Sequence, residues 1–152
     1  MGDQDKPETL KNIFVQNKLR PKIIIDDGSH RSRHQQTSLA ELFQYLVPGG
    51  FYIIEDIGEF EFKKNENHNE ILPARMYPDL NNLPAVFTSK NVDHRFLYNS
   101  TLTFLMRYCV TKSIDSFFLN KEQSEYLEKN IEFCNIHRSN IFHKYIAFFQ
   151  KK

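Results

Sequence analysis

Several residue types that would point to a particular class of protein are scarce in this chain of 152 residues. It has no tryptophan, 2 cysteines and 5 glycines, and its formal net charge is +1. A charge so close to zero gives no general electrostatic case for binding nucleic acid or an anionic membrane. No apolar run approaches the roughly 20 residues that a membrane-spanning helix needs. We therefore expect neither a nucleic-acid partner nor a membrane partner.

The two cysteines and the N-terminal sequence bear on the compartment. Cys109 and Cys134 are isolated and lack the spacing of a metal site. The first residues, MGDQDKPET, have no basic n-region and no apolar h-region, and so do not indicate a signal peptide. These features predict reduced core thiols in a cytoplasmic protein. The length predicts a single domain over residues 1–152 that buries roughly two-thirds of its unfolded surface.

The stretch from Lys22 to Ile57 organises the chain. Ile23–Ile25 is a β-branched run, typical of a strand buried on both faces, and Phe51–Ile54 is a second apolar strand. The turn residues Pro48–Gly50 precede the second strand. Between the strands, apolar residues recur at helical spacing: Leu39, Leu42, Phe43 and Leu46. This order predicts a right-handed βαβ unit, in which the two strands are parallel and adjacent.

Local signals also predict where helices begin. Asp5 is expected to cap an N-terminal helix whose first turn contains Pro7. Ser32 and Gln35 fit a capping box at the start of the helix between the two strands. Asn120 is expected to cap a short helix in the C-terminal third of the chain.

The remaining segments complete the expected domain. Residues 100–112 are predicted to form a helix, and residues 131–137 and 141–149 two strands joined by a hairpin turn at 138–140. Residues 58–97 show no clear periodicity. Such a long irregular segment is uncommon inside a domain, so we expect a lid or substrate loop there.

Both strands of the predicted parallel pair end in acidic residues. The first ends in Asp26 and Asp27, and the second in Glu55 and Asp56. Because neighbouring parallel strands end at the edge where α/β sheets bind ligands, these carboxylates should lie together with His30. Asp27, Glu55 and Asp56 are suitable ligands for Mg²⁺ or a similar divalent cation, which would relieve their mutual repulsion. His30 could take a proton from a hydroxyl held on that metal.

The acidic strand ends also have a purely structural interpretation. Acidic residues and glycine often end strands without any further role, and a single acidic strand end would favour that view. Two adjacent acidic strand ends with Gly-Ser-His between them favour function. Asp26 could hydrogen-bond locally, and His34 and Gln35 fit a helix start better than a ligand set. We assign no role to the scattered histidines His68, His94, His137 and His143.

Taken together, these segments resemble a known family. The pattern IIIDDGSH…HQ…LF..L.PGG.YIIED resembles the class I S-adenosylmethionine-dependent methyltransferases. Within these it is most similar to the metal-dependent sugar O-methyltransferases of macrolide biosynthesis, the macrocin and mycinamicin type. The closing IEF…IFHKYIAFFQKK is similar to the family's last antiparallel hairpin. Gly2-Asp3-Gln4 is similar to the family's GDQ, whose residues lie against the cofactor's adenine.

The resemblance implies an activity. Asp27, Glu55 and Asp56 would be metal ligands and His30 the general base. Asp3 and Gln4 would contact the S-adenosylmethionine, and a second cofactor would be Mg²⁺ or a similar cation. The implied reaction is methylation of a hydroxyl on a sugar or similar small molecule.

The implied fold is α/β, the C-terminal half of a Rossmann-like methyltransferase. It has a parallel βαβ unit followed by an antiparallel hairpin and lacks the N-terminal cofactor-binding strands, since no G-x-G occurs. We therefore expect a truncated or split form, or alternatively a non-catalytic methyltransferase-like binding or assembly protein. The open edge of strand 22–26 should pair with an N-terminal half or a second copy, unless residues 1–19 cover it.

Overall fold

The computed structural model describes residues 3–4, 6–58, 100–138 and 144–152. Its elements follow one another in this order: α1 (Pro7–Gln16), β1 (Ile23–Asp26), α2 (Ser32–Leu42), the 3₁₀ turn η1 (Phe43–Tyr45), β2 (Phe51–Ile57), α4 (Thr101–Thr111), α5 (Lys121–Asn130), β3 (Ile131–Arg138) and β4 (Tyr145–Lys151). The predictions for Asp5, for residues 59–97 of the expected loop and for residues 139–140 of the turn lie outside the described ranges, as do His68, His94 and His143.

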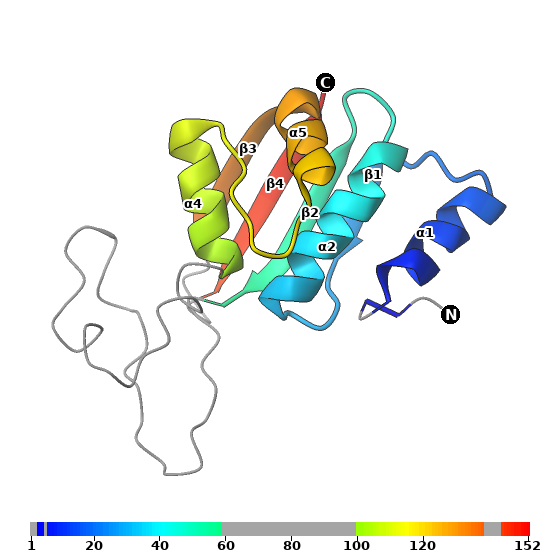
Figure 1. The fold of residues 1–152 in the computed structure, drawn as a ribbon, viewed down its shortest axis with the longest axis horizontal. Coiled ribbons are helices and arrows are strands. Elements are labelled where there is room, and N and C mark those ends of the chain that lie inside the picture. The colour runs from blue at the N-terminus through cyan, green and yellow to red at the C-terminus, as the bar shows by residue number, and fades with distance from the viewer. Residues whose placement is uncertain (1–2, 5, 59–99, 139–143) are drawn as a thin grey trace, which may run out of the picture.

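The described strands form one sheet of four in the order β1-β2-β4-β3 (Figure 1). β1 and β2 are parallel, with Ile23 opposite Phe51, whereas β4 pairs antiparallel with both β2 and β3. The predicted parallel βαβ unit and the antiparallel pair that follows it are therefore confirmed. This topology places the C-terminal ends of β1 and β2 next to each other.

The helices α2, α4 and α5 cover one face of this sheet (Figure 1). Alternate strand residues point toward them and are fully buried, among them Tyr52, Ile54 and Phe149. All four apolar residues that predicted the α2 helix are buried as well: Leu39, Leu42, Phe43 and Leu46. Within the described residues, no helix is both long enough and apolar enough to span a membrane.

The opposite face of the sheet is not covered by any described helix. Ile23 and Ile25 are 56% and 57% exposed. The register aligns these residues with two rows that cross the sheet: Ile23, Phe51, Gln150 and Phe133, then Ile25, Ile53, Phe148 and Asn135. The expectation that β1 is buried on both faces is therefore wrong, because only its helix-facing side is packed.

The helix starts show where local sequence signals determine the cap and where they do not. Asn120 caps α5 in a full capping box, as predicted, and Pro7 is at the start of α1. The capping box predicted for α2 is wrong, because Ser32 is already inside the helix. Its Oγ accepts a hydrogen bond from the backbone N–H of Thr101, 69 residues away, at 3.1 Å. Tertiary contacts thus take the place of the local cap.

The two cysteines are free thiols, as predicted, and both are partly buried. Cys109 on α4 and Cys134 on β3 lie with their sulfur atoms 3.8 Å apart. Burial raises the pKa of the Cys134 thiol, and the nearby Cys109 adds to this effect. A thiol with a raised pKa is a poor nucleophile, which suits a packing role.

Candidate metal site and the network beneath it

Three of the predicted side chains meet at the C-terminal ends of β1 and β2. One ligand atom each from Asp27, His30 and Asp56 lie within 4.8 Å of one another. His30 Nε2 is 4.0 Å from Asp27 Oδ1 and 3.8 Å from Asp56 Oδ2. The His30 side chain remains 37% exposed, so a small molecule can reach it. The structure therefore assembles two carboxylates and an imidazole at the predicted edge.

The backbone at this site departs from regular geometry. His30 and Asp56 have φ values of 58° and 53°, in the left-handed region that side chains with a Cβ rarely adopt. Such residues cost about 1–3 kcal/mol each and gather at functional sites. The register between β2 and β4 also shifts between Ile54 and Ile57, as a β-bulge does. A bulge redirects side chains, so strict strand alternation does not give the direction of Asp56.

Glu55 is not brought into this group by the described structure. Its carbonyl oxygen accepts a hydrogen bond of 3.2 Å from Gln35 Nε2, which ties the bulge to the first turns of α2. Gln35 is 1% exposed and is thus a structural residue of the helix start, as expected. Glu55 as a metal ligand stays a prediction.

The chemistry of the cluster fits a hard divalent cation. Carboxylate oxygens are the preferred ligands of Mg²⁺, which commonly binds through one or two carboxylates and keeps several waters. A cation is already attracted to the position: the ammonium of Lys144 pairs with Asp56 Oδ2. His30 Nδ1 is buried and has no hydrogen-bond partner among the described residues, while Nε2 faces the carboxylates. The donor set and its charge therefore suit the predicted metal.

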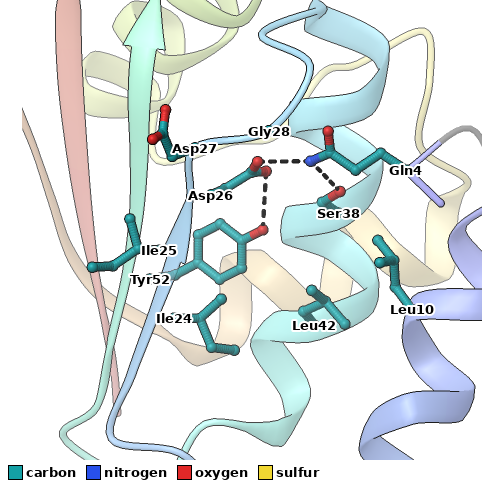
Figure 2. A pocket seen from close by; sticks show the side chains of 10 residues that line it. All are labelled: Gln4, Leu10, Ile24, Ile25, Asp26, Asp27, Gly28, Ser38, Leu42 and Tyr52. Atoms are coloured by element: carbon teal, nitrogen blue, oxygen red, sulfur yellow. Dashed lines mark hydrogen bonds between the residues drawn. The ribbon is translucent and has the colours of Figure 1, made fainter. Parts of the chain in front are cut away.

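Asp26, the neighbour of Asp27, belongs to a different site on the other side of β1. It is 6% exposed, and its two oxygens accept hydrogen bonds from Gln4 Nε2 at 2.7 Å and from Tyr52 Oη at 3.2 Å (Figure 2). Burial raises the pKa of Asp26, and these two hydrogen bonds oppose that effect. The pKa of Tyr52 is also raised, first by burial and then by Asp26. Asp26 thus hydrogen-bonds within the scaffold, with partners distant in sequence.

Gln4 links the N-terminal segment to the loop that carries His30. Its Oε1 accepts from the backbone N–H of Ser29 at 2.7 Å, and its Nε2 also donates to Ser38 Oγ at 3.3 Å. A Cβ added to Gly28 would lie 2.2 Å from Gln4 Oε1, so the glycine leaves room for the amide. Asp3 lies beside it, and its backbone N–H donates to Thr9 Oγ1 at 2.8 Å. The roles of Asp3 and Gln4 as adenine contacts stay predictions.

A pocket of about 330 Å³ lies among α1, β1 and α2, directly beneath this network. Figure 2 shows the side chains of Asp26 and Tyr52 on the helix side, and that of Asp27 on the opposite side of β1. The lining residues are Gln4, Leu10, Ile24, Ile25, Asp26, Asp27, Gly28, Ser38, Leu42 and Tyr52. This network was not among the predictions made from the sequence. Strand alternation could have indicated it, because Asp26 must share a face with Ile24 and not with Asp27.

No family model matches the chain, whereas several curated proteins and solved structures do. The mycinamicin VI 2''-O-methyltransferase of Micromonospora griseorubida is 47% identical over 57 residues, which is 37% of this chain and 14% of that protein. The demethylmacrocin O-methyltransferase of Streptomyces fradiae is 43% identical over 58 residues, 38% of this chain and 14% of the relative. A tetracenomycin-C 3'-O-methyltransferase of Streptomyces olivaceus, acting on a methoxy-rhamnosyl form, is 57% identical over 56 residues, with 37% and 14% coverage.

Among solved structures, the MycE methyltransferase of the mycinamycin biosynthetic pathway, in complex with Mg, SAH and mycinamycin VI, matches with a TM-score of 0.55 and 25% identity. The alignment covers 99% of this chain and 30% of that one. The chain therefore spans less than a third of its solved relative. This chain thus resembles the macrocin- and mycinamicin-type sugar O-methyltransferases, as its residues predict, and its α/β fold matches a C-terminal part of theirs.

Proposed function

We propose that this chain provides the metal site and general base of an S-adenosylmethionine-dependent, divalent-metal-assisted O-methyltransferase. The observation that carries this proposal is the convergence of Asp27, His30 and Asp56 at the sheet edge. The matching MycE structure contains Mg, SAH and a mycinamycin. By analogy, the acceptor would be a hydroxyl of a sugar or similar small molecule.

The residues suggest a division of roles. Asp27 and Asp56 would hold the cation, with Glu55 as a further proposed ligand, and the bound cation would orient and acidify the acceptor hydroxyl. His30 Nε2, facing these carboxylates, would accept the hydroxyl proton. The oxygen would then form a bond to the sulfonium methyl carbon as the carbon–sulfur bond breaks, leaving a neutral thioether. In this scheme, Asp3 and the stem of Gln4 contact the adenine, since the Gln4 amide is engaged with Asp26 and Ser29.

Further chain is proposed to complete the domain. Among the described strands β1 lies at the edge of the sheet. Its side chains Ile23 and Ile25 are exposed on the face that no described helix covers. The first helix packs against α2 and leaves these two side chains exposed. We propose that an N-terminal half or a second copy pairs with β1 and covers the adjacent rows of mostly apolar residues, because an open apolar edge is a template for another strand.

One sequence observation favours a second candidate, a non-catalytic binding or assembly protein. The chain contains no G-x-G, the motif that cradles the cofactor in such folds. Isothermal titration with S-adenosylmethionine separates the candidates when it is performed on the chain alone and after reconstitution with a glycine-rich N-terminal half. The enzyme proposal expects weak or no binding alone and binding after reconstitution.

Metal binding tests the site directly. We expect Mn²⁺, as a spectroscopic substitute for Mg²⁺, to bind the wild-type chain and to bind Asp56→Ala at least tenfold more weakly. Glu122→Ala, which removes an exposed carboxylate from the first turn of α5, serves as the control and should bind as wild type does. Equal affinities in wild type and Asp56→Ala would show that the site is wrongly placed.

A further inference from the structure

Lys144 brings a positive charge into the proposed metal site. Its Nζ donates a hydrogen bond to Asp56 Oδ2, the same oxygen that lies 3.8 Å from His30 Nε2. Lys144 directly precedes β4, and the pairing of Ile57 with Tyr145 places it beside the bulge. Although Lys144 is 88 residues from Asp56 in sequence, the sheet register brings the two residues close enough for the ammonium to reach the carboxylate.

A divalent cation in this cluster would bind the same carboxylate that the ammonium pairs with. The group from Asp27, His30 and Asp56 is compact, with its ligand atoms within 4.8 Å of one another, and Asp56 contributes through a carboxylate oxygen. Positive charges a few ångströms apart repel strongly, even in a partly solvated site. The ammonium and the divalent cation therefore compete for Asp56.

The ion pair can be opened without disturbing the fold. The side chains of Lys144 and Asp56 are 40% and 42% exposed, so water can solvate both groups when they separate. Pairs this accessible contribute little to stability, and the lysine stem is flexible enough to swing into solvent. Because the metal must first break this ion pair, the presence of Lys144 should lower the metal affinity moderately without abolishing binding.

We propose that Lys144 is an internal competitor of the metal. Its ammonium partly neutralises Asp56 when no divalent cation is bound, and it leaves when one binds. This inference rests on the metal site proposed above and adds a residue that sets the affinity of that site. Lys144 acts only through its ion pair with Asp56 and takes no part in proton or methyl transfer.

The test compares Mn²⁺ affinities, measured from the electron paramagnetic resonance signal of the free ion, in the full chain and its variants at physiological ionic strength. Lys144→Met removes the charge and keeps the apolar stem. It should bind Mn²⁺ about two- to fivefold more tightly than wild type, the range expected from releasing a half-exposed ion pair. Lys144→Arg keeps the charge and should bind no more tightly than wild type.

A matched control separates this local effect from a change in net charge. Lys121→Met makes the same charge change on α5, where the lysine is 88% exposed and pairs with Glu125. It should leave Mn²⁺ affinity within about twofold of wild type, because an exposed charge at a distance is screened by solvent and salt.

The outcomes distinguish the inference from the proposal beneath it. If Lys144→Met binds as wild type does while Asp56→Ala loses binding, the metal site stands and the competitor role is overturned. Equal tightening in Lys144→Met and Lys121→Met also overturns it, because net charge alone then accounts for the change. If neither wild type nor Lys144→Met binds Mn²⁺, the metal site itself fails and takes this inference with it.

Discussion

Gly28→Ala should destabilise this chain through one side chain, Gln4. The new Cβ would lie 2.2 Å from Gln4 Oε1, 2.5 Å from its Cδ and 2.6 Å from its Nε2. Contacts this short cannot persist, and the atoms involved form the end of a flexible side chain. We therefore expect the Gln4 amide to be expelled while the backbone stays in place. Gly28 itself has no positive φ, so alanine brings no backbone strain.

The cost follows from the hydrogen bonds that the amide makes. Gln4 loses its bonds to Asp26 at 2.7 Å, to the backbone N–H of Ser29 at 2.7 Å and to Ser38 at 3.3 Å. A typical bond contributes about 0.5–1.5 kcal/mol and one to a charged group about 1.5–3 kcal/mol. Water can replace the partner of the exposed Ser29, and alanine stabilises by about 0.4–1 kcal/mol through the unfolded chain. The net loss should be about 1–3 kcal/mol.

A double-mutant cycle tests this explanation. Urea unfolding followed by far-ultraviolet circular dichroism gives the free energy of unfolding for wild type, Gly28→Ala, Gln4→Ala and the double variant. In the Gln4→Ala background the clash is gone, so Gly28→Ala should be neutral or slightly stabilising. If Gly28→Ala costs the same in both backgrounds, the glycine is required for some other reason and the reasoning fails.

Three further predictions concern Asp26, His30 and the β1 edge. Burial raises the pKa of Asp26 in the folded state above 3.8, so the folded protein binds this proton more tightly than the unfolded chain does. The stability that protonated Asp26 contributes is therefore fully present below the pKa of the unfolded chain, and it is lost as pH rises through the pKa of the folded state. The unfolding free energy of wild type relative to Asp26→Asn should therefore fall with rising pH, and a flat difference would contradict this. In a reconstituted enzyme, His30→Ala should lower turnover by roughly 10²–10⁴-fold with cofactor affinity nearly intact, and full turnover would remove His30 from the mechanism. Hydrogen exchange at Ile23–Ile25 should accelerate on dilution, whereas protection that persists in a demonstrated monomer would defeat the open-edge argument.

The sequence predicted those parts of the fold that depend on local pattern. The run Ile23–Ile25, the helical spacing that begins at Leu39, and the cap at Asn120 each involve residues close together in the chain. The structure confirms the strand, the helix and the cap, although Ile23 and Ile25 are exposed on one face of the sheet. The parallel pairing of the strands followed from their connection by a helix.

Long-range contacts defeated local prediction in other places. Ser32 reads as a helix cap, yet its hydroxyl pairs with the backbone of Thr101. Similarly, no local pattern indicates that Lys144 meets Asp56, because that contact depends on the register of β4 and on the bulge in β2. A bulge changes the direction of a side chain without changing the residue types around it.

The adjacent pair Asp26 and Asp27 shows how a single strand end can support two separate tasks. Successive side chains of a strand point to opposite faces, so one carboxylate must turn toward the helices and the other away from them. Asp26 is buried and fixed by Gln4 and Tyr52, whereas the Asp27 side chain is 63% exposed and lies within reach of His30. Fixing Asp26 also fixes the backbone from which Asp27 projects, and the Gln4 bond to Ser29 holds the next residues of the same loop. The buried carboxylate is therefore the desolvated one, on the helix face, and the exposed one is held on the other face at the site where we propose that a cation binds.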